Sequence, residues 1–357
     1  MALASNVLIV IAVVLYILYD RNVLALPPWI LEAGKTWIFY AGMIACIQKI
    51  LSMTHFISLH LLSFNDCSVY GAKTKKAYAI VTGASAGIGR SMALELAKRG
   101  MNLIIVARTQ QNLDELKEEI HRKYSGEIQV EVCPLDCYKI EASTNALANK
   151  CKDLKVTMLI NNVGCETGEP EPLELKSSKD MQQIIDLNIT FNAQLTRACL
   201  GSMIENAKEL RVKGIVVNLA SQAALLENPM ISTYSAAKAF NTSFSRALAG
   251  EMRNHHKHKG IIHVCNLRPA FVESAMSGLK ANDIKGILLG VVKPEVFAIH
   301  AVNKFGHCDD ISPVPWHDMV GIFLSQFCPS KLKETILYRL SMVRYNKKKA
   351  KGEYKRE

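Results

Sequence analysis

Short apolar runs alternate with longer segments of helical periodicity through the centre of the chain. The segments between the runs carry apolar residues at the spacing of one helix face, so each run is followed by a predicted helix. The alternation predicts a parallel sheet covered by helices on both faces, which is the α/β class. The runs have the length and the β-branched or apolar character of buried strands: Ala77–Thr82, Met101–Ala107, Ile128–Cys133, Val156–Asn161, Ile215–Ala220 and Ile261–Asn266.

A seventh strand is harder to place from the pattern. Pro313 and Pro315 fall where it would lie, after the last apolar run. Because proline donates no hydrogen bond to a ladder, such a strand has to lie at an edge of the sheet.

The first apolar segment, Ala2–Tyr19, has the length of a membrane anchor. It contains no charged residue, and as a helix at roughly 1.5 Å per residue it covers most of a bilayer core. A cleaved secretory signal is the alternative, but no basic residue precedes the run and no small-x-small cleavage site stands before Asp20. We therefore expect an uncleaved anchor.

A second apolar stretch, Trp37–Leu62, is interrupted by Lys49, His55 and His60. It fits either a tilted span, with Lys49 reaching the interface, or a helix that lies in the interface. Both alternatives predict contact with a membrane.

The C-terminal end is apolar and then basic. Met319–Phe327 is too short to span a bilayer, so we expect a helix on the membrane surface, with an ordinary core helix as the alternative. The formal net charge is +11, but residues 331–357 hold seven Lys and three Arg against three Glu. Because the charge is concentrated in this tail, nucleic acid is not an expected partner. The basic tail either binds anionic lipid headgroups or is simply solvated, and both alternatives stay open.

These patterns divide the chain into three regions. We expect a membrane anchor region over residues 1–70, an α/β domain over 71–300, and a C-terminal membrane-associated segment with a basic tail over 301–357. The ten cysteines form no Cys-x-x-Cys pair, so we expect reduced thiols in a domain that faces the cytosol. The cluster of His255, His256 and His258 is expected to be solvated, and no metal is predicted.

A glycine-rich turn follows the first predicted strand. Its spacing is Gly-x-x-x-Gly-x-Gly, and a helical segment comes directly after it. Glycines at such a turn let backbone amides approach a diphosphate, and the N-terminus of the helix favours its negative charge. A purely structural turn is the alternative. The residues predicted to bind the dinucleotide here are Gly83, Ser85, Gly87, Ile88 and Gly89.

Arg108 stands after the second predicted strand, where an NAD-dependent enzyme usually has Asp or Glu for the ribose hydroxyls. A guanidinium matches a 2′-phosphate in charge and geometry. The sequence therefore predicts NADPH rather than NADH as the cofactor.

Residues suited to proton transfer follow in a fixed order, with Asn188 first, then Ser221, then Tyr234 and Lys238. Tyr234 and Lys238 are four residues apart and share one face of a predicted helix. A ketone that accepts hydride develops negative charge on its oxygen, so a nearby acid must supply a proton. We expect the Lys238 ammonium to lower the pKa of the Tyr234 phenol from about 10 toward neutrality.

Together the motifs resemble the short-chain dehydrogenase/reductase superfamily over roughly residues 75–275. The resemblance implies a Rossmann-like, doubly wound parallel sheet. It also implies that Tyr234 donates the proton, that Ser221 hydrogen-bonds the carbonyl oxygen, that Lys238 also holds the nicotinamide ribose, and that Asn188 keeps a water chain leading to Lys238.

The same resemblance adds cofactor contacts beyond the glycine-rich turn. Asp136, after the third strand, matches the position that meets the adenine, with a helix cap as the structural alternative. Asn162 belongs to the Asn-Asn-x-Gly motif that braces the sheet and the cofactor. The segment Pro269–Ser274 matches Pro-Gly-x-Val-x-Thr only in part, because Ala270 replaces the glycine. The remaining cofactor contacts implied in this way are Tyr234, Lys238, Pro269, Val272 and Ser274.

The apolar ends narrow the resemblance to the very-long-chain 3-oxoacyl-CoA reductases of the endoplasmic reticulum membrane and their steroid-dehydrogenase relatives. This implies NADPH-dependent reduction of a 3-oxoacyl-CoA in fatty-acid elongation, with the catalytic domain facing the cytosol. A hydroxysteroid or other lipid-ketone dehydrogenase, and a non-catalytic protein that binds other elongation enzymes, are the alternatives. The implied partners are a lipid substrate (an acyl-CoA or a steroid), the membrane and other elongation enzymes, and the oligomeric state stays open.

Residues 275–292 follow the last predicted strand, where the superfamily closes over its substrate. The segment has mixed polarity and contains glycines. We expect its apolar side chains to line a substrate entrance or its lid, with core packing as the alternative. These side chains are Met276, Leu279, Ile287, Leu288 and Leu289.

Overall fold

The computed structural model describes residues 28–124, 127–167, 170–226, 228–274 and 278–350 of the 357-residue chain. The predicted anchor Ala2–Tyr19 lies outside these residues. The chain forms two compact units, Met1–Leu62 and Ser63–Glu357.

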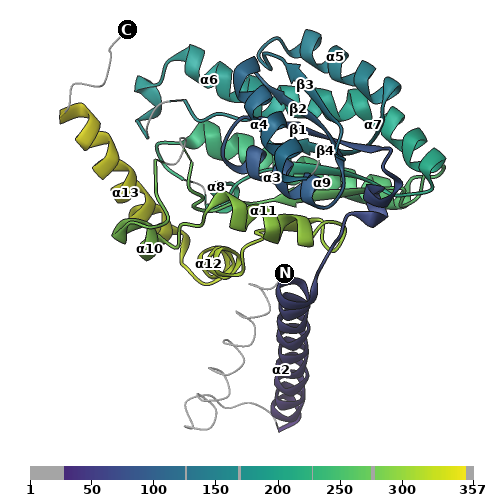
Figure 1. Ribbon diagram of the computed structural model, residues 1–357. Helices are drawn as coiled ribbons and strands as arrows, with labels where there is room; N and C mark the ends of the chain where they lie inside the picture. The colour runs from purple at the N-terminus through teal and green to yellow at the C-terminus, as the bar shows by residue number, and fades with distance from the viewer. Residues whose placement is uncertain (1–27, 125–126, 168–169, 227, 275–277, 351–357) are drawn as a thin grey trace. The chain divides into compact units, whose positions relative to one another are not determined.

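From residue 28 onward, the first unit is one long apolar helix and the turn that ends it. Helix α2, Pro28–Ile57, continues into a π-helical turn η1, Ser58–Leu62 (Figure 1). The stretch Glu32–Leu62 is long enough and apolar enough to cross a membrane. Large apolar side chains such as Trp37 and Phe39 are exposed along it, as expected for a helix that lies in lipid rather than in a core. The apolar stretch predicted from residue 37 is therefore part of a single helix with the length of a span.

The second unit is built on a seven-stranded sheet in the order β3-β2-β1-β4-β5-β6-β7. Every pair of neighbouring strands is parallel. The strand order reverses between β1 and β4, and in a doubly wound fold a dinucleotide binds at the carboxyl ends of the strands on either side of such a reversal. The strands are β1 Ala77–Thr82, β2 Asn102–Ala107, β3 Val130–Pro134, β4 Lys155–Asn161, β5 Gly214–Leu219, β6 Ile262–Leu267 and β7 Asp310–Ile311.

The six predicted strands are confirmed, with ends shifted by no more than two residues. The seventh strand, β7, is a two-residue edge strand that ends before Pro313, as the prolines require. It lies beyond residue 300, where the sequence predicted the domain to end, so the sheet continues past that residue. The chain must return to the sheet edge once more before its C-terminal helices.

Helices cover both faces of the sheet, as predicted, and Figure 1 shows them around the strands. On one face, buried side chains of β1 such as Tyr78 and Ile80 belong to a core that includes residues of α5, α7 and α9. The alternate residues of β1, Ala79 and Val81, point to the opposite face, where α3 packs against α11. The helices are α3 Gly87–Lys98, α4 Gln110–Lys123, α5 Ile140–Asp153, α6 Ser178–Ile185, α7 Asn192–Leu210, α8 Ala223–Leu226, α9 Ser232–Asn254, α10 Ile284–Leu289, α11 Pro294–Asn303, α12 Pro315–Gln326 and α13 Ser330–Ala350.

Short helical turns complete the second unit. They are η2 Ser68–Tyr70, η3 Ala72–Thr74, η4 Leu173–Leu175 and the π-helical η5 Asp186–Phe191. The turn η5 joins α6 to α7 in one continuous helical path, and π-helical turns of this kind often occur at functional sites.

A ladder of buried polar side chains ties together the carboxyl ends of β4 to β7. Asn161, Asn218, Asn266 and Asp310 are register partners on successive strands. The Asn161 amide donates to Asn218 at 2.8 Å, and the Asn266 amide donates to Asp310 at 2.8 Å. Asp310 also pairs with Arg268 at 2.7 Å. Because buried polar networks of this kind have few alternative arrangements, they hold the strand ends from which the site residues emerge.

Candidate active site

The glycine-rich turn joins β1 to α3 and has the geometry that only glycine allows. Gly83 and Gly87 have positive φ angles of 66° and 55°, where other residues are strained. Gly89 has a different constraint, because a Cβ there would lie 2.2 Å from the Gly83 carbonyl oxygen. The turn therefore presents bare backbone at the N-terminus of α3, which suits a diphosphate.

Asn162 holds this turn from the neighbouring strand. Its side-chain amide donates to the carbonyl oxygens of Thr82 at 2.8 Å and Gly83 at 3.3 Å. In return, the Thr82 hydroxyl accepts from the backbone amides of Asn162 at 3.0 Å and Val163 at 3.1 Å. Asn162 therefore links β4 to the carboxyl end of β1, as predicted for a residue that braces the sheet.

Arg108 and Asp136 lie at the carboxyl ends of β2 and β3, on the β3 side of β1. Arg108 is exposed, so its guanidinium is accessible to a phosphate. Asp136 is partly buried and accepts a hydrogen bond from the backbone amide of Tyr138 at 3.2 Å. The carboxylate therefore closes a local turn and is not the cap of α5, whose N-cap residue is Lys139.

Ser221, Tyr234 and Lys238 come together where β5 ends and α9 begins. The Lys238 ammonium is buried and donates to the Leu219 carbonyl oxygen at 3.0 Å. It also lies over the Tyr234 ring, 5.6 Å from the ring centroid. Ser221 follows Leu219 by two residues, and its hydroxyl is near enough to the Tyr234 phenol to act on the pKa of that phenol. The Tyr234 side chain therefore has a hydroxyl and a cation as neighbours.

The charge state of Tyr234 differs from the prediction. Burial raises the pKa of the Tyr234 phenol, and the carboxylate of Glu166 adds to this effect, whereas the Ser221 hydroxyl opposes it. The expected net lowering of the pKa of Tyr234 is wrong for this structure, because burial has the largest effect and the Lys238 ammonium faces the ring and donates to the Leu219 carbonyl instead of the phenol oxygen. The phenol is therefore held in its protonated form, the form that can donate a proton to a ketone.

Lys238 responds to the same burial in the opposite direction. Loss of solvent lowers the pKa of its ammonium to about 8, while the carboxylate of Glu166 acts to raise it. Its positive charge is thus present at neutral pH and close to titration.

Asn188 is oriented toward this lysine by η5. Its side-chain amide donates to the carbonyl oxygens of Cys165 at 2.7 Å and Ile184 at 3.0 Å. Among the described residues, its buried Oδ1 has no hydrogen-bond donor. A Cβ at Gly164 would lie 2.5 Å from that oxygen and 3.2 Å from the Lys238 ammonium. The absence of a side chain at Gly164 therefore keeps the space between Asn188 and Lys238 open.

The loop after β6 closes the other side of the glycine-rich turn. The Pro269 carbonyl accepts from the Gln222 backbone amide at 2.9 Å, and Val272 is buried and bridges to Val292. A Cβ on Gly87 would lie 3.7 Å from the Ser274 Cβ. The partial motif of this loop therefore meets the glycine-rich turn, although the two are far apart in sequence.

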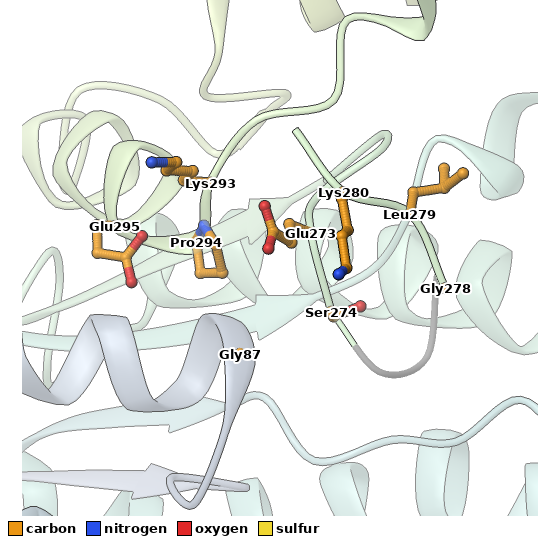
Figure 2. A pocket seen from close by; sticks show the side chains of 9 residues that line it. All are labelled: Gly87, Glu273, Ser274, Gly278, Leu279, Lys280, Lys293, Pro294 and Glu295. Atoms are coloured by element: carbon orange, nitrogen blue, oxygen red, sulfur yellow. The ribbon is translucent and has the colours of Figure 1, made fainter. Parts of the chain in front are cut away.

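Gly87 and Ser274 also line one cavity of about 730 Å³. Figure 2 shows the cavity with the start of α3 at Gly87 and the charged side chains of the loop and of α11 around it. Its remaining lining residues are Glu273, Gly278, Leu279, Lys280, Lys293, Pro294 and Glu295. The cavity therefore lies between the start of α3 and the loop after β6, and Ser221, Tyr234 and Lys238 are not among its lining residues.

The predicted entrance residues divide into different environments. Leu279 is buried and lines this cavity, whereas Ile287 and Leu289 are 69% and 37% exposed. Met276 lies outside the described residues, and the Leu288 side chain is also outside them. The burial of Leu279 at the cavity wall fits both an entrance and core packing, and the two exposed residues present apolar side chains to the surface.

Two residues beside the site were not predicted from the sequence. Cys165 and Glu166 follow Gly164 directly. The carboxylate of Glu166 acts on the pKa of both Tyr234 and Lys238, whereas burial raises the pKa of the Cys165 thiol and keeps it neutral. The only sequence signal for them is their position after the Asn-Asn-x-Gly motif.

The short chain dehydrogenase family matches residues 77–285 of the chain. The very-long-chain 3-oxoacyl-CoA reductase of Vanderwaltozyma polyspora is 32% identical over 273 residues, with 75% of each chain covered. That of Kluyveromyces lactis is 35% identical over 251 residues, with 70% of this chain and 69% of the yeast protein covered. Among solved structures, a short-chain dehydrogenase from Sphingobium yanoikuyae in complex with NADPH is 25% identical, with a TM-score of 0.54 over 63% of this chain and 83% of that chain.

Proposed function

The chain belongs to the short-chain dehydrogenase family, and from this premise we propose that it reduces a 3-oxoacyl-CoA to the 3-hydroxyacyl-CoA with NADPH, in very-long-chain fatty-acid elongation. The observation that carries the proposal is the placement of Ser221 and Lys238 around the Tyr234 phenol. The yeast relatives named as very-long-chain 3-oxoacyl-CoA reductases support the substrate class.

A bound nicotinamide supplies the hydride, and the residues of the chain supply the proton and the orientation. The carbonyl oxygen of the substrate accepts hydrogen bonds from Ser221 and Tyr234, and the Tyr234 hydroxyl gives up its proton as that oxygen becomes an alkoxide. The raised pKa of Tyr234 keeps this proton in place until the oxygen becomes basic.

Lys238 and Asn188 restore the proton. The Lys238 ammonium stabilises the phenolate that forms, since opposite charges attract strongly where water is scarce. The Asn188 oxygen and the Lys238 ammonium approach the same point beside Gly164, which suits a water chain that returns a proton to the pair.

The dinucleotide fits the residues of the site. We assign its diphosphate to the backbone of Gly83, Ser85, Gly87, Ile88 and Gly89, and its adenosine half to Arg108 and Asp136. The exposed guanidinium of Arg108 supports NADPH over NADH, because it can pair with a 2′-phosphate.

The membrane part of the proposal concerns the first unit. We assign Glu32–Leu62 as a membrane span, on its length and its exposed apolar side chains. The relatives named for very-long-chain substrates support placing the protein in the endoplasmic reticulum membrane, with the second unit in the cytosol. Protection of the second unit from added protease in sealed microsomes would contradict the cytosolic side.

The test of the activity is a substrate panel. Full-length protein purified in detergent, supplied with NADPH, should reduce long-chain 3-oxoacyl-CoAs faster than keto-steroids at equal concentration. Reduction of keto-steroids alone would replace the acyl-CoA assignment by a steroid one. Loss of both activities in a protein that still binds NADPH would contradict the catalytic proposal.

A further inference from the structure

Helix α12 has its polar face inward and its apolar face outward. Trp316, Met319, Phe323 and Phe327 follow one another at spacings of three or four residues, so they share one side of the helical path. These side chains are between 52% and 60% exposed. A helix on the surface of a water-soluble domain normally has the opposite arrangement.

The inward face is held by specific polar contacts. His317 and Asp318 are buried, and His317 contacts the Gly290 carbonyl oxygen at 2.9 Å through Nε2. The Gln222 amide donates to the His317 carbonyl oxygen at 3.1 Å, and a Cβ on Gly321 would lie 2.4 Å from the Gln222 side chain. Turning α12 to bury its apolar side would break these contacts. The core-helix alternative for this segment is therefore wrong.

The apolar side of α12 continues into its neighbours. A Cβ on Gly290, at the end of α10, would lie 2.5 Å from the Trp316 ring, so α10 and α12 touch. Ile284 and Ile287 of α10 are 80% and 69% exposed. Exposed apolar side chains on two touching helices indicate a binding face rather than scattered exposure.

Two features indicate a lipid surface as the occupant. The second unit begins at Ser63, directly after a helix of spanning length that ends at Leu62, so a bilayer that holds this helix is within reach of the unit. Helix α13 starts four residues after α12 ends and exposes Lys331, Arg339 and Arg344, which complement anionic headgroups.

We propose that α12, together with α10, docks in the plane of a lipid bilayer as a second membrane contact of this chain. At roughly 1.5 Å per residue α12 is too short to span a bilayer, so it lies in the interface with its apolar side toward the acyl chains. Its polar face contacts Gln222, which adjoins Ser221 of the proposed active site.

Tryptophan fluorescence in the full-length protein tests this docking without any assay of activity. The chain has three tryptophans, and Trp29→Phe with Trp37→Phe leaves Trp316 as the only one. The protein is reconstituted into vesicles of phosphatidylcholine and phosphatidylserine in which the phosphatidylcholine carries bromine near the headgroup end of its acyl chains. We expect the loss of most Trp316 emission relative to vesicles without bromine, and less loss when the bromine is deep in the acyl chains.

A matched control moves the single tryptophan away from α12. Tyr124 ends α4 beside the edge strand β3, whereas α12 follows the opposite edge strand β7. The variant with Tyr124→Trp and Trp316→Phe should keep its emission in the brominated vesicles. Retained NADPH binding checks the folding of both variants.

Equal emission of Trp316 with and without bromine, in a folded protein, would overturn the docking. Self-association through α12 that protects Trp316 from the brominated lipid would also overturn the docking, because the apolar side of α12 would then bind a second copy of the chain.

Discussion

Gly164 offers a test that depends on the geometry of the site rather than on any proton-transferring side chain. In Gly164→Ala the added methyl group would lie 2.5 Å from Asn188 Oδ1 and 3.2 Å from the Lys238 ammonium. Gly164 is not among the residues with positive φ, so the cost comes from this collision and not from backbone strain. Overpacking of this kind costs roughly 1–3 kcal/mol. If the displaced Asn188 and Lys238 are needed in the transition state, kcat should fall roughly 5- to 150-fold.

The assay follows NADPH oxidation with a saturating long-chain 3-oxoacyl-CoA, alongside the dissociation constant of NADPH. We expect a smaller effect on the dissociation constant of NADPH, because the glycine-rich turn lies on the other side of Asn162. Gly201→Ala is the matched control, because Gly201 lies within α7 with nothing within 4 Å of its added Cβ, and it should leave kcat unchanged. A kcat for Gly164→Ala within about twofold of wild type would refute the role given to this contact.

Three further predictions concern the cofactor, the lysine and the substrate surface. Arg108→Asp should weaken NADPH far more than NADH, because it adds repulsion to the loss of attraction; equal weakening in titrations with both cofactors would make Arg108 structural. Because burial lowers the pKa of Lys238 to about 8, its positive charge is lost as the pH rises through that value, and kcat/KM for NADPH should decline above about pH 8. A pH profile of kcat/KM that stays flat to about pH 10 would contradict this prediction. The double substitution Ile287→Ser and Leu289→Ser should raise KM for a long-chain 3-oxoacyl-CoA more than for a short-chain analogue, because each lost apolar contact is worth up to roughly 1.5–3 kcal/mol. An equal rise in KM for both chain lengths would exclude a substrate entrance at these residues.

Local patterns were sufficient to predict the sheet and the order of the site residues. The apolar run Ala77–Thr82 is β1 with the same bounds, because a strand buried on both faces is apolar throughout. The spacing of Tyr234 and Lys238 was likewise enough to place both on α9, since residues four apart share a helix face.

Tertiary packing decided what the sequence did not predict. The pKa of Tyr234 depends on its burial and on the direction in which the Lys238 ammonium points, and neither follows from a spacing of four. Helical periodicity in Met319–Phe327 also does not reveal which side of the helix faces the domain. The contacts of His317 and Gln222 determine it, and they join segments far apart in the chain.

The short strand β7 is a related case. Its two residues carry no periodicity that a sequence pattern could detect. Asp310 is held there by Asn266 and Arg268 of the neighbouring chain segment, so the strand exists because of partners across the sheet.

The most direct test of the proposed reaction is Tyr234→Phe in the full-length protein. The substitution removes one oxygen and keeps the ring over which the Lys238 ammonium lies, so NADPH binding should stay close to that of wild type. We predict that conversion of a long-chain 3-oxoacyl-CoA to the 3-hydroxyacyl-CoA, followed by product analysis with NADPH in excess, is abolished. Turnover within a few-fold of wild type would show that Tyr234 is not the proton donor and would contradict the proposed chemistry.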